Sequence, residues 1–568
     1  MWCGGVSKAE KFGTVCLGLS TLELSNYSYM RLVFVIALLL IPVSVFSQTV
    51  GTLLNEAETS EGFTLFHPLS FDTTYLINNC GERINQWPSN LPNGGFAGLK
   101  SNGNLVKSLK FSGAGTFTGG GITGRIVEQD WSGAVIWEYS LADSNYHLHH
   151  DVHILPNENL LVIAWEKKSV SECIAAGRDT NNIPSEGLWP CVVFEVEPVG
   201  NFSSVVWEWH SWDHLVQDFD PTKANYGDLL LNKSRIDVNK GNPNNGPDWI
   251  HLNGMDYNED LDMIVLSSPM LNEIFIIDHS TSSAEASSNS GGLSGQGGDL
   301  LWRWGNPVNY NGGVTADQQL YFQHDPQWVD RGTMYTNMIS VFSNQEVVNS
   351  TDVSKVKIIE FPFDSINYTF PVMNNAYLPE TSFFEYQLAD SLFSAHISGV
   401  QVQENNNILI AAGNQSTYIE IDTSSQIVWS YLAPIKTNGQ IASQGETGLF
   451  LKRLFQPKKY PVDFSGFVGH DTSPSSPIEQ NPSPCVSTVS LEEVNANEIS
   501  VFPNPATDQL IIESSSNDLL SARLYSASGT LVKEFKVSKG QNHLSIKWLN
   551  SGIFYLNVES KWIKVIVN

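Results

Sequence analysis

Apolar and polar residues alternate in short runs along most of the chain, the pattern of half-buried β-strands. Between residues 50 and 470 the runs form repeated units that open on a hairpin signal, two strands joined by a polar turn such as LPNEN at 155–159. Each unit closes on an apolar-Trp-x-aromatic strand, or a diverged copy of it. The closing strands lie at 135–139, 205–209, 300–304, 383–386 and 427–431. The pattern predicts an all-β fold built from a repeat.

Units of four strands that cannot bury both faces alone stack around an axis. Counting the units predicts a six-bladed β-propeller over residues 48–470, and residues 449–461 are expected to close the ring against the first unit. A β-sandwich array or a β-helix is the alternative architecture. The variable repeat length and the Trp-rich closing strands favour the propeller.

The two ends of the chain follow other patterns. Arg31 precedes an apolar core that ends near Ser47, which is the layout of a secretory signal peptide. We therefore take residues 1–47 as an upstream extension and signal peptide, with Met30 as the expected true start; an N-terminal membrane anchor is the alternative. Residues 471–497, rich in Ser, Pro and Asn, predict a linker.

Residues 498–568 alternate in short strands and predict a small C-terminal β-sandwich. This unit resembles the C-terminal sorting domain of the type IX secretion system of Bacteroidetes, through VFPNPA at 501–506 and GIFY at 552–555. The resemblance implies that the type IX secretion machinery is a partner and that the protein is secreted or held at the cell surface. An ordinary adhesive β-sandwich module is the alternative.

The charge balance changes what the protein can bind. The 568 residues hold 31 Lys and Arg against 59 Asp and Glu, a net charge of −28. Nucleic-acid binding by phosphate neutralisation needs a basic face and is excluded as a function class. An anionic substrate gains no long-range attraction either, so local cations must supply it.

Four of the six cysteines lie after residue 47, and export permits disulfides. Cys173 and Cys191 flank a loop rich in Gly, Asn and Pro and are the predicted pair. Without a CxxC motif, a thiolate zinc site is not expected.

Histidines recur at one place in the repeat, the start of the first strand of a unit. The four are His150, His251, His324 and His396. Because first strands line the central channel of a propeller, these side chains are expected to meet at one mouth, although a recurring His can also be structural, as we expect for His153 and His279. Imidazole can act as a nucleophile, an acid/base or a metal ligand. No GxSxG, HExxH or phosphate-binding glycine loop competes with this site.

Segments around these histidines resemble the aryl-sulfate sulfotransferase family. They are residues 149–161, 248–268, 297–307 and 317–328. The resemblance implies a six-bladed, periplasmic or secreted propeller that moves a sulfuryl group from a phenolic sulfate ester to a phenol acceptor. The implied mechanism is ping-pong through a sulfated histidine, with no nucleotide donor, no cofactor and no metal ligand.

Matched position by position, the nucleophile falls on His324 and the assisting histidines fall on His251 and His150, with His149 as the competing choice for the last. One assisting histidine would be the acid/base for the phenol, and both would bind sulfate oxygens. Three further residues of the expected mouth are predicted to bind the substrate: His396, Arg303 and Asn253.

One position departs from the family. The family usually carries an Arg directly after the Ser-Ser pair that ends the second strand of the His251 unit, and this chain has Pro269 there. Proline donates no charge-assisted hydrogen bond, and losing such a donor typically costs ~10²–10³ in rate. Either another cation such as Arg303 substitutes, or activity is weak or lost. Two other functions stay open: a non-catalytic, ligand-binding secreted propeller, and a metal-dependent propeller hydrolase or lyase with histidine ligands.

Overall fold

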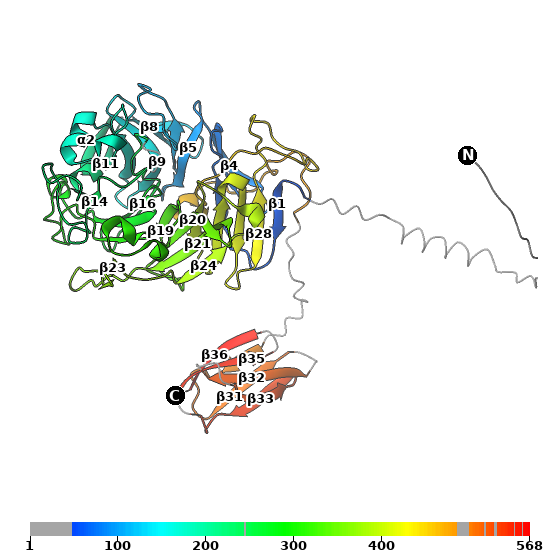
Figure 1. Ribbon diagram of the computed structural model, residues 1–568. Coiled ribbons are helices and arrows are strands. Elements are labelled where there is room, and N and C mark those ends of the chain that lie inside the picture. Colours follow the sequence, from blue (N-terminus) through cyan, green and yellow to red (C-terminus); the bar gives the residue numbers. More distant parts are fainter. Residues whose placement is uncertain are drawn as a thin grey trace, which may run out of the picture. The chain divides into compact units, whose positions relative to one another are not determined.

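Nearly all of the regular secondary structure in the described residues is β-strand. The computed structural model describes residues 48–200, 202–242, 246–485, 499–515, 519–526, 531–549, 551–558 and 561–567. The predicted signal peptide and the later part of the predicted linker lie outside these ranges. No helix among the described residues is long and apolar enough to cross a membrane. The predicted all-β class is confirmed (Figure 1).

Six antiparallel sheets of four or five strands, here called blades 1 to 6, occupy the described part of residues 48–460. Blade 1 consists of β29 (Lys459–Tyr460), β2 (Phe63–Phe66), β3 (Thr73–Ile77) and β4 (Arg83–Pro88). Blade 2 consists of β5 (Asn93–Leu99), β6 (Leu105–Lys110), β7 (Gly124–Gln129) and β8 (Val135–Ser140). Blade 3 consists of β9 (Tyr146–Ile154), β10 (Leu160–Glu166), β11 (Cys191–Val199) and β12 (Phe202–His210).

The other three blades follow in chain order. Blade 4 consists of β15 (Gly254–Asn258), β16 (Met263–Ser268), β17 (Glu273–Asp278) and β18 (Trp302–Trp304). Blade 5 consists of β19 (His324–Trp328), β20 (Met338–Val348), β21 (Thr351–Glu360) and β24 (Phe384–Gln387). Blade 6 consists of β25 (Gly399–Val402), β26 (Ile408–Ala412), β27 (Thr417–Ile421), β28 (Ile427–Leu432) and β1 (Gly51–Asn55).

In the described residues, short helices and strand pairs lie in the loops that connect the blade strands. Two are helices, α2 (Val170–Ala176) and α3 (Ser283–Ala286). Two are small strand pairs: β13 (Leu215–Val216) with β14 (Ile236–Asp237), and β22 (Val372–Met373) with β23 (Ala376–Tyr377).

The innermost strands of the blades form a ring. Strand β9 lies against both β5 and β15, β15 against β19, and β19 against β25. Strand β29 joins the ring through side chains: the Leu99 N–H of β5 donates to the Tyr460 hydroxyl at 2.8 Å, and the Gln401 side chain of β25 hydrogen-bonds the Lys459 backbone. Strands far apart in sequence therefore surround one axis, which is the propeller arrangement.

The ring is closed twice by the ends of the propeller segment. Strand β29 pairs with β2, Lys459 opposite Thr64, which confirms the predicted closure by residues 449–461. Strand β1 pairs with β28 as a fifth, outermost strand of blade 6.

The tryptophan of the closing strands explains the repeat. Trp137 is buried on the outermost strand of blade 2, and its indole N–H donates to the Phe202 carbonyl of blade 3 at 3.3 Å. Trp429 of blade 6 donates in the same way to the Asn79 carbonyl of blade 1 at 2.7 Å. Comparable hydrogen bonds to the following blade come from Trp87, Trp207 and Trp302. Each indole fills the space between two blades while its polar N–H is satisfied by the neighbour.

The predicted disulfide is wrong. Cys173, on α2, and Cys191, at the start of β11, are both free and buried in the same apolar cluster. The disulfide instead joins Cys80 to Cys485, 405 residues apart in sequence. Closeness in sequence misled the prediction, because ring closure brings the end of the propeller segment back to blade 1. There, residues 471–485, the first part of the predicted linker, bridge to the propeller at Glu82 and Ser443.

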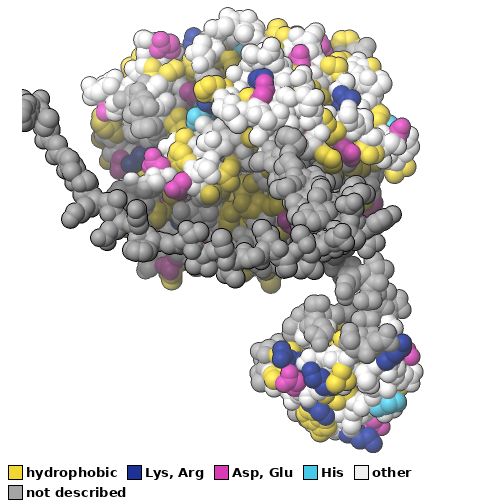
Figure 2. Space-filling view, turned by 90° about the vertical axis from the view of Figure 1, so that its right-hand side faces the viewer, with side chains coloured by type: hydrophobic (Ala, Val, Ile, Leu, Met, Phe, Trp, Pro, Cys, Tyr) yellow, Lys and Arg dark blue, Asp and Glu magenta, His cyan; other side chains and the backbone are white. Residues whose placement is uncertain are grey.

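The C-terminal domain contains two sheets with their own apolar core. One sheet consists of β30 (Ile499–Phe502), β31 (Gln509–Ser514) and β34 (Gly540–Ser545). The other consists of β33 (Leu531–Val537), β32 (Leu520–Ser526), β35 (Gly552–Val558) and β36 (Lys561–Val567). Figure 2 shows Lys and Arg side chains gathered on the visible face of this domain, whereas the propeller surface in the same view is mostly uncharged.

Candidate active site

Histidines from different blades meet where the innermost strands begin. The ring centres of His150 and His251 are 4.5 Å apart, and those of His149 and His150 are 5.1 Å apart. Burial, followed by the nearness of His251, His149 and His324, holds the pKa of His150 well below its ordinary value. The structure therefore brings the three predicted catalytic histidines together, each at most 8 % exposed.

The backbone kinks at the same place in each contributing blade. Non-glycine residues rarely have positive φ, yet φ is 54° at His150, 52° at His251, 56° at Asp325 and 56° at Ile397. Strand pairing also slips at these points in β9 and β19. Such bulges and left-handed residues redirect side chains and are typical of functional sites. Here the positive φ falls on His150 and His251 themselves, and on the residues that directly follow His324 and His396.

His324 is held as a neutral imidazole with one defined tautomer. Its Nδ1 lies 2.8 Å from the Asn344 side-chain oxygen and 3.1 Å from the Phe322 carbonyl, so Nδ1 carries the proton. Its Nε2 accepts a hydrogen bond from the Ile397 N–H at 3.2 Å. Burial lowers the pKa of His324 to about 3, with the nearby His251 adding to the effect. At neutral pH Nε2 therefore carries the lone pair that a nucleophilic imidazole requires, and in this structure that lone pair accepts the Ile397 N–H.

His251 is oriented by a carboxylate that sequence reasoning missed. Asp248 accepts hydrogen bonds from the His251 Nδ1 and, at 2.9 Å, from the Trp165 indole N–H. The proton on Nδ1 leaves Nε2 to exchange a proton with a ligand, and the carboxylate stabilises the imidazolium that forms. The spacing of Asp248 and His251, three residues apart, was the only signal in the sequence.

His149 and His150 have different surroundings. The His149 ring stacks on Trp165 with centres 4.1 Å apart, and its Nε2 lies 3.7 Å from the Cys191 sulfur. His149 thus faces the core, and its Nδ1 lies 2.8 Å from Nδ1 of His150. The His150 ring lies closer to His251, with centres 4.5 Å apart, than the His149 ring does at 6.5 Å.

A glycine loop, residues 119–121, packs directly on the imidazoles. A Cβ on Gly121 would lie 2.1 Å from Nε2 of His150, and a Cβ on Gly119 would lie 2.5 Å from the Trp165 ring. A Cβ on Gly120 would lie 3.6 Å from Cε1 of His251. At Gly119 and Gly121 only a residue without a side chain fits this close, so the loop brings its peptide groups to the site, where the Gly121 carbonyl accepts the His150 N–H at 2.7 Å.

The aspartates that follow two of the histidines join blades instead of serving the site. Asp151 accepts the Met255 N–H of blade 4 at 2.8 Å, and Asp325 accepts the Val400 N–H of blade 6 at 3.0 Å. Burial raises the pKa of Asp151 to about 6 and that of Asp325 to about 8. The recurring His-Asp pair therefore combines a site residue with a structural one.

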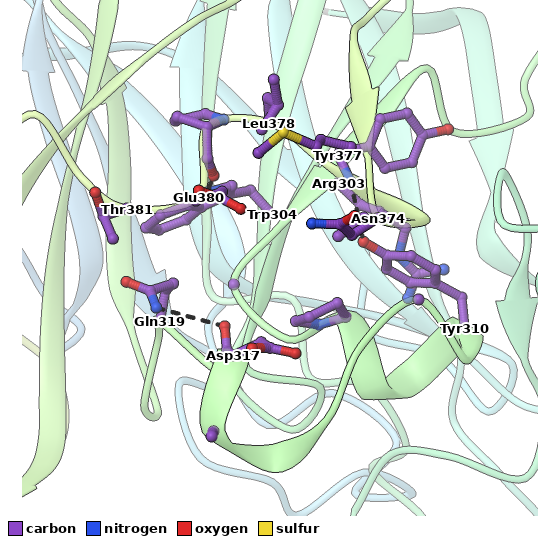
Figure 3. A pocket seen from close by; sticks show the side chains of 17 residues that line it. Arg303, Trp304, Tyr310, Asp317, Gln319, Asn374, Tyr377, Leu378, Glu380 and Thr381 are labelled. Carbon is purple, nitrogen blue, oxygen red and sulfur yellow. Dashed lines mark hydrogen bonds between the residues drawn. The ribbon is translucent and has the colours of Figure 1, made fainter.

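Arg303 does not lie among the histidines. It is 1 % exposed, and its guanidinium forms a bidentate ion pair with Glu273. Its Nη1 donates to the Arg235 carbonyl at 2.8 Å. It lines a separate cavity of about 400 Å³ beside Tyr310 and Tyr377 (Figure 3). The cause is its strand: β18 is the outermost strand of blade 4, so its side chains lie at the rim and not at the axis.

Asn253 and His396, also predicted to bind substrate, differ from each other. Asn253 is fully buried and donates to the Gln323 carbonyl at 2.8 Å, so it fixes the residue before His324. His396 is half-buried and accepts a hydrogen bond from Nη1 of Arg453 at 2.9 Å. His153 and His279 were expected to be structural. Nδ1 of His153 lies 2.9 Å from an Asp256 carboxylate oxygen, and His279 pairs with Asp262 and Glu195.

The returning segment before β29 contributes residues that sequence reasoning missed. Besides Arg453 at His396, the Phe455 ring centre lies 5.9 Å from that of His324, and the Gln456 side chain donates to Asp151 at 3.0 Å. These residues follow the last repeat, so no repeat position marked them. Across the described ranges, no group of three or more His, Cys, Asp or Glu side chains has the arrangement of a metal site.

Comparison with known proteins adds two family matches. The model of the family described as Arylsulfotransferase (ASST) matches residues 97–441, and that of the secretion system C-terminal sorting domain matches residues 500–568. No curated protein matches the chain. Solved structures that resemble the chain are about 10 % identical to it in sequence.

Three of these structures illustrate the sequence identity, the coverage and the TM-scores. A protein of unknown function from Bacteroides caccae is 10 % identical, with 66 % of this chain and 94 % of that chain covered and a TM-score of 0.34. The periplasmic gluconolactonase of Pseudomonas aeruginosa is 10 % identical, with 86 % and 100 % covered and a TM-score of 0.33. Virginiamycin B lyase from Staphylococcus aureus is 10 % identical, with 67 % and 87 % covered and a TM-score of 0.30.

Proposed function

Because the chain belongs to the arylsulfotransferase family, we propose that it transfers a sulfuryl group from a phenolic sulfate ester to a phenol acceptor through a sulfated His324. The observation that carries the proposal is the state of His324: buried, neutral, with Nδ1 bonded to Asn344 and Nε2 directed away from it. A histidine in this state, beside two further imidazoles, suits nucleophilic catalysis.

In the first half-reaction, the lone pair on Nε2 of His324 attacks the sulfur of the ester. The N–S bond forms, the bond between sulfur and the aryl oxygen breaks, and the leaving phenolate takes a proton from Nε2 of protonated His251. The 3.2 Å hydrogen bond from the Ile397 N–H to Nε2 of His324 must break before Nε2 can bond to the sulfur. Asp248 stabilises the His251 imidazolium before the transfer.

In the second half-reaction, an acceptor phenol replaces the first product. Neutral His251 takes the phenolic proton as the oxygen attacks sulfur, and the N–S bond breaks. Nε2 of His324 recovers its lone pair, His251 is protonated again, and no proton or cofactor is consumed. His150 would hold sulfuryl oxygens in both steps, because its ring lies within 4.5 Å of the His251 ring, centre to centre.

The test is a donor–acceptor assay with purified protein, a chromogenic aryl sulfate and a phenol, without added nucleotide or metal. We expect phenol release that requires the acceptor and disappears in His324→Asn, together with a sulfated His324 peptide in mass spectra after donor alone. No release from any of several donors would favour the ligand-binding propeller. Activity lost to a chelator, with stoichiometric metal in the protein, would favour the metal-dependent hydrolase or lyase.

The chain also carries a secretion system C-terminal sorting domain, which supports export of the protein. We further propose that the type IX machinery is its export partner and that the mature protein is secreted or held at the cell surface. Deleting residues 498–568 should leave the protein inside the producing cell. Unchanged export of that deletion variant would contradict the proposal.

A further inference from the structure

The negatively charged sulfate group of an aryl sulfate needs a cationic side chain to bind it. Neither position 269 nor Arg303 supplies that cation at the histidines. The protein carries a net charge of −28, so the attraction must be local. Position 269 holds a proline, and Arg303 is neutralised by Glu273 at the rim of blade 4. Arg178, the other arginine buried in the described ranges, donates Nη1 to the Val238 and Lys240 carbonyls. None of these positions places a free guanidinium at the histidines.

Arg453 lies beside the fourth histidine of the repeat, His396. Its Nη1 donates to Nε2 of His396 at 2.9 Å, and His396 directly precedes Ile397, whose N–H reaches Nε2 of His324. In the part of the chain that the structure describes, Arg453 forms no salt bridge with a carboxylate, and it is exposed. Burial and then the Arg453 charge lower the pKa of His396, so this histidine accepts the hydrogen bond as a neutral ring and leaves the charge of Arg453 without a counter-ion.

A cavity of about 680 Å³ adjoins this corner. Arg453 and Asn414 both line it, and both contact His396. Leu432, Phe450 and Leu451 provide apolar walls. The carboxylate that also lines the cavity, Glu446, is paired with Lys436 at 2.8 Å and does not compete for Arg453. The lining of the cavity thus combines a cation, Arg453, with apolar side chains suited to an aromatic ring.

We propose that Arg453 is the cation that binds the sulfate group of the donor, and that the adjoining cavity receives the donor's aryl ring. This assignment rests on the proposed sulfuryl transfer at His324. Arg453 is a substrate-binding residue in this scheme: the guanidinium holds two sulfate oxygens while sulfur approaches Nε2 of His324. An uncharged phenol acceptor does not need this contact, so donor and acceptor should respond differently to its loss.

The experiment compares Arg453→Met and Arg453→Lys with Lys452→Met, a matched control in which the adjacent cation, bonded to the Ser70 carbonyl, is removed. We expect Arg453→Met to lower kcat/KM for an aryl sulfate donor about 10- to 100-fold, the range of a charge-assisted hydrogen bond, with an unchanged KM for the phenol acceptor. Arg453→Lys should restore part of the loss, and Lys452→Met should stay within about twofold of the parent protein.

A binding measurement separates this inference from the proposed reaction. Inorganic sulfate and phenyl sulfate are titrated into parent and variants by calorimetry, and melting curves without anion check that each variant folds. Binding of both anions that is lost in Arg453→Met, with phenyl sulfate the tighter ligand, supports the site even if no transfer is seen. Wild-type donor KM and wild-type sulfate binding in a folded Arg453→Met would overturn it, as would equal losses in Lys452→Met.

Discussion

The side-chain oxygen of Asn344 lies 2.8 Å from Nδ1 of His324, and the amide nitrogen of the same side chain donates to the Ile397 carbonyl at 2.7 Å. The second contact fixes which way the amide points, so the oxygen is the atom offered to His324. A protonated Nδ1 follows, and with it an Nε2 that carries the lone pair. One asparagine on β20 thus selects the tautomer of the proposed nucleophile.

Replacing Asn344 should therefore act on the chemistry. With Asn344→Leu we expect kcat to fall roughly 10²-fold at an unchanged donor KM, because the imidazole loses its preferred tautomer. Gln345→Ala is the control, since that side chain only donates to the Ala395 carbonyl. A donor KM that rises as much as kcat falls would assign Asn344 to substrate binding instead.

The pH profile provides a second test of His324. Burial lowers its pKa to about 3, and the nucleophile must be neutral, so its protonation should reduce activity only as the pH falls toward 3. Asn344→Asp would place a carboxylate against Nδ1, favour the imidazolium and move this acid limb to higher pH. Rates measured across pH 3–8 should show the shift; an acid limb unchanged in the variant would separate it from His324.

Asp248 and His251 should act as one unit. Asp248→Asn removes the carboxylate that stabilises the His251 imidazolium, and we expect roughly a 10²-fold lower transfer rate. Because both changes damage the same proton transfer, the double variant with His251→Asn should be no slower than the slower single variant. Losses that multiply would show that the two residues act independently.

The glycine loop offers a matched pair of substitutions. Gly115 and Gly121 both have φ near +70°, but a Cβ on Gly115 meets nothing within 4 Å, whereas one on Gly121 would overlap the His150 imidazole. Gly115→Ala should lose about 1 kcal/mol of stability to backbone strain, and Gly121→Ala should lose more, because the clash with the His150 ring adds to the strain. Only Gly121→Ala should lose transfer activity as well. Equal activity in the two would mean that the loop can move away from His150 at no cost.

His279 should make stability depend on pH. Burial disfavours its charge, but the contacts with Asp262 and Glu195 outweigh this and raise the pKa of His279 to about 9. A raised pKa stabilises the folded state fully below about 6.5 and loses that contribution as the pH rises through 9. Melting temperatures between pH 6 and 10 should fall less steeply for His279→Gln than for the parent; parallel curves would contradict the ion pairs.

Much of the fold was predictable from the sequence, because the physical causes repeat locally. On the closing strands of blades 1 to 4 and 6 an indole hydrogen-bonds the following blade, so one contact accounts for a Trp at a fixed repeat position, as in Trp137 and Trp429. The closing strand of blade 5, Phe384–Gln387, has no Trp. The convergence of His150, His251 and His324 followed from the same geometry, since the first strands of all blades surround one axis.

By itself, the sequence determined the all-β repeat, the closure by residues 449–461 and the histidines that meet at the axis. Tertiary structure alone decided what the non-repeating residues do. Arg303 became a rim residue because β18 is outermost, and Cys80 found Cys485 because the ring returns the chain to blade 1. Arg453 reaches His396 for the same reason. Periodicity records only contacts that every blade makes, whereas partners brought together once by ring closure leave no pattern along the chain.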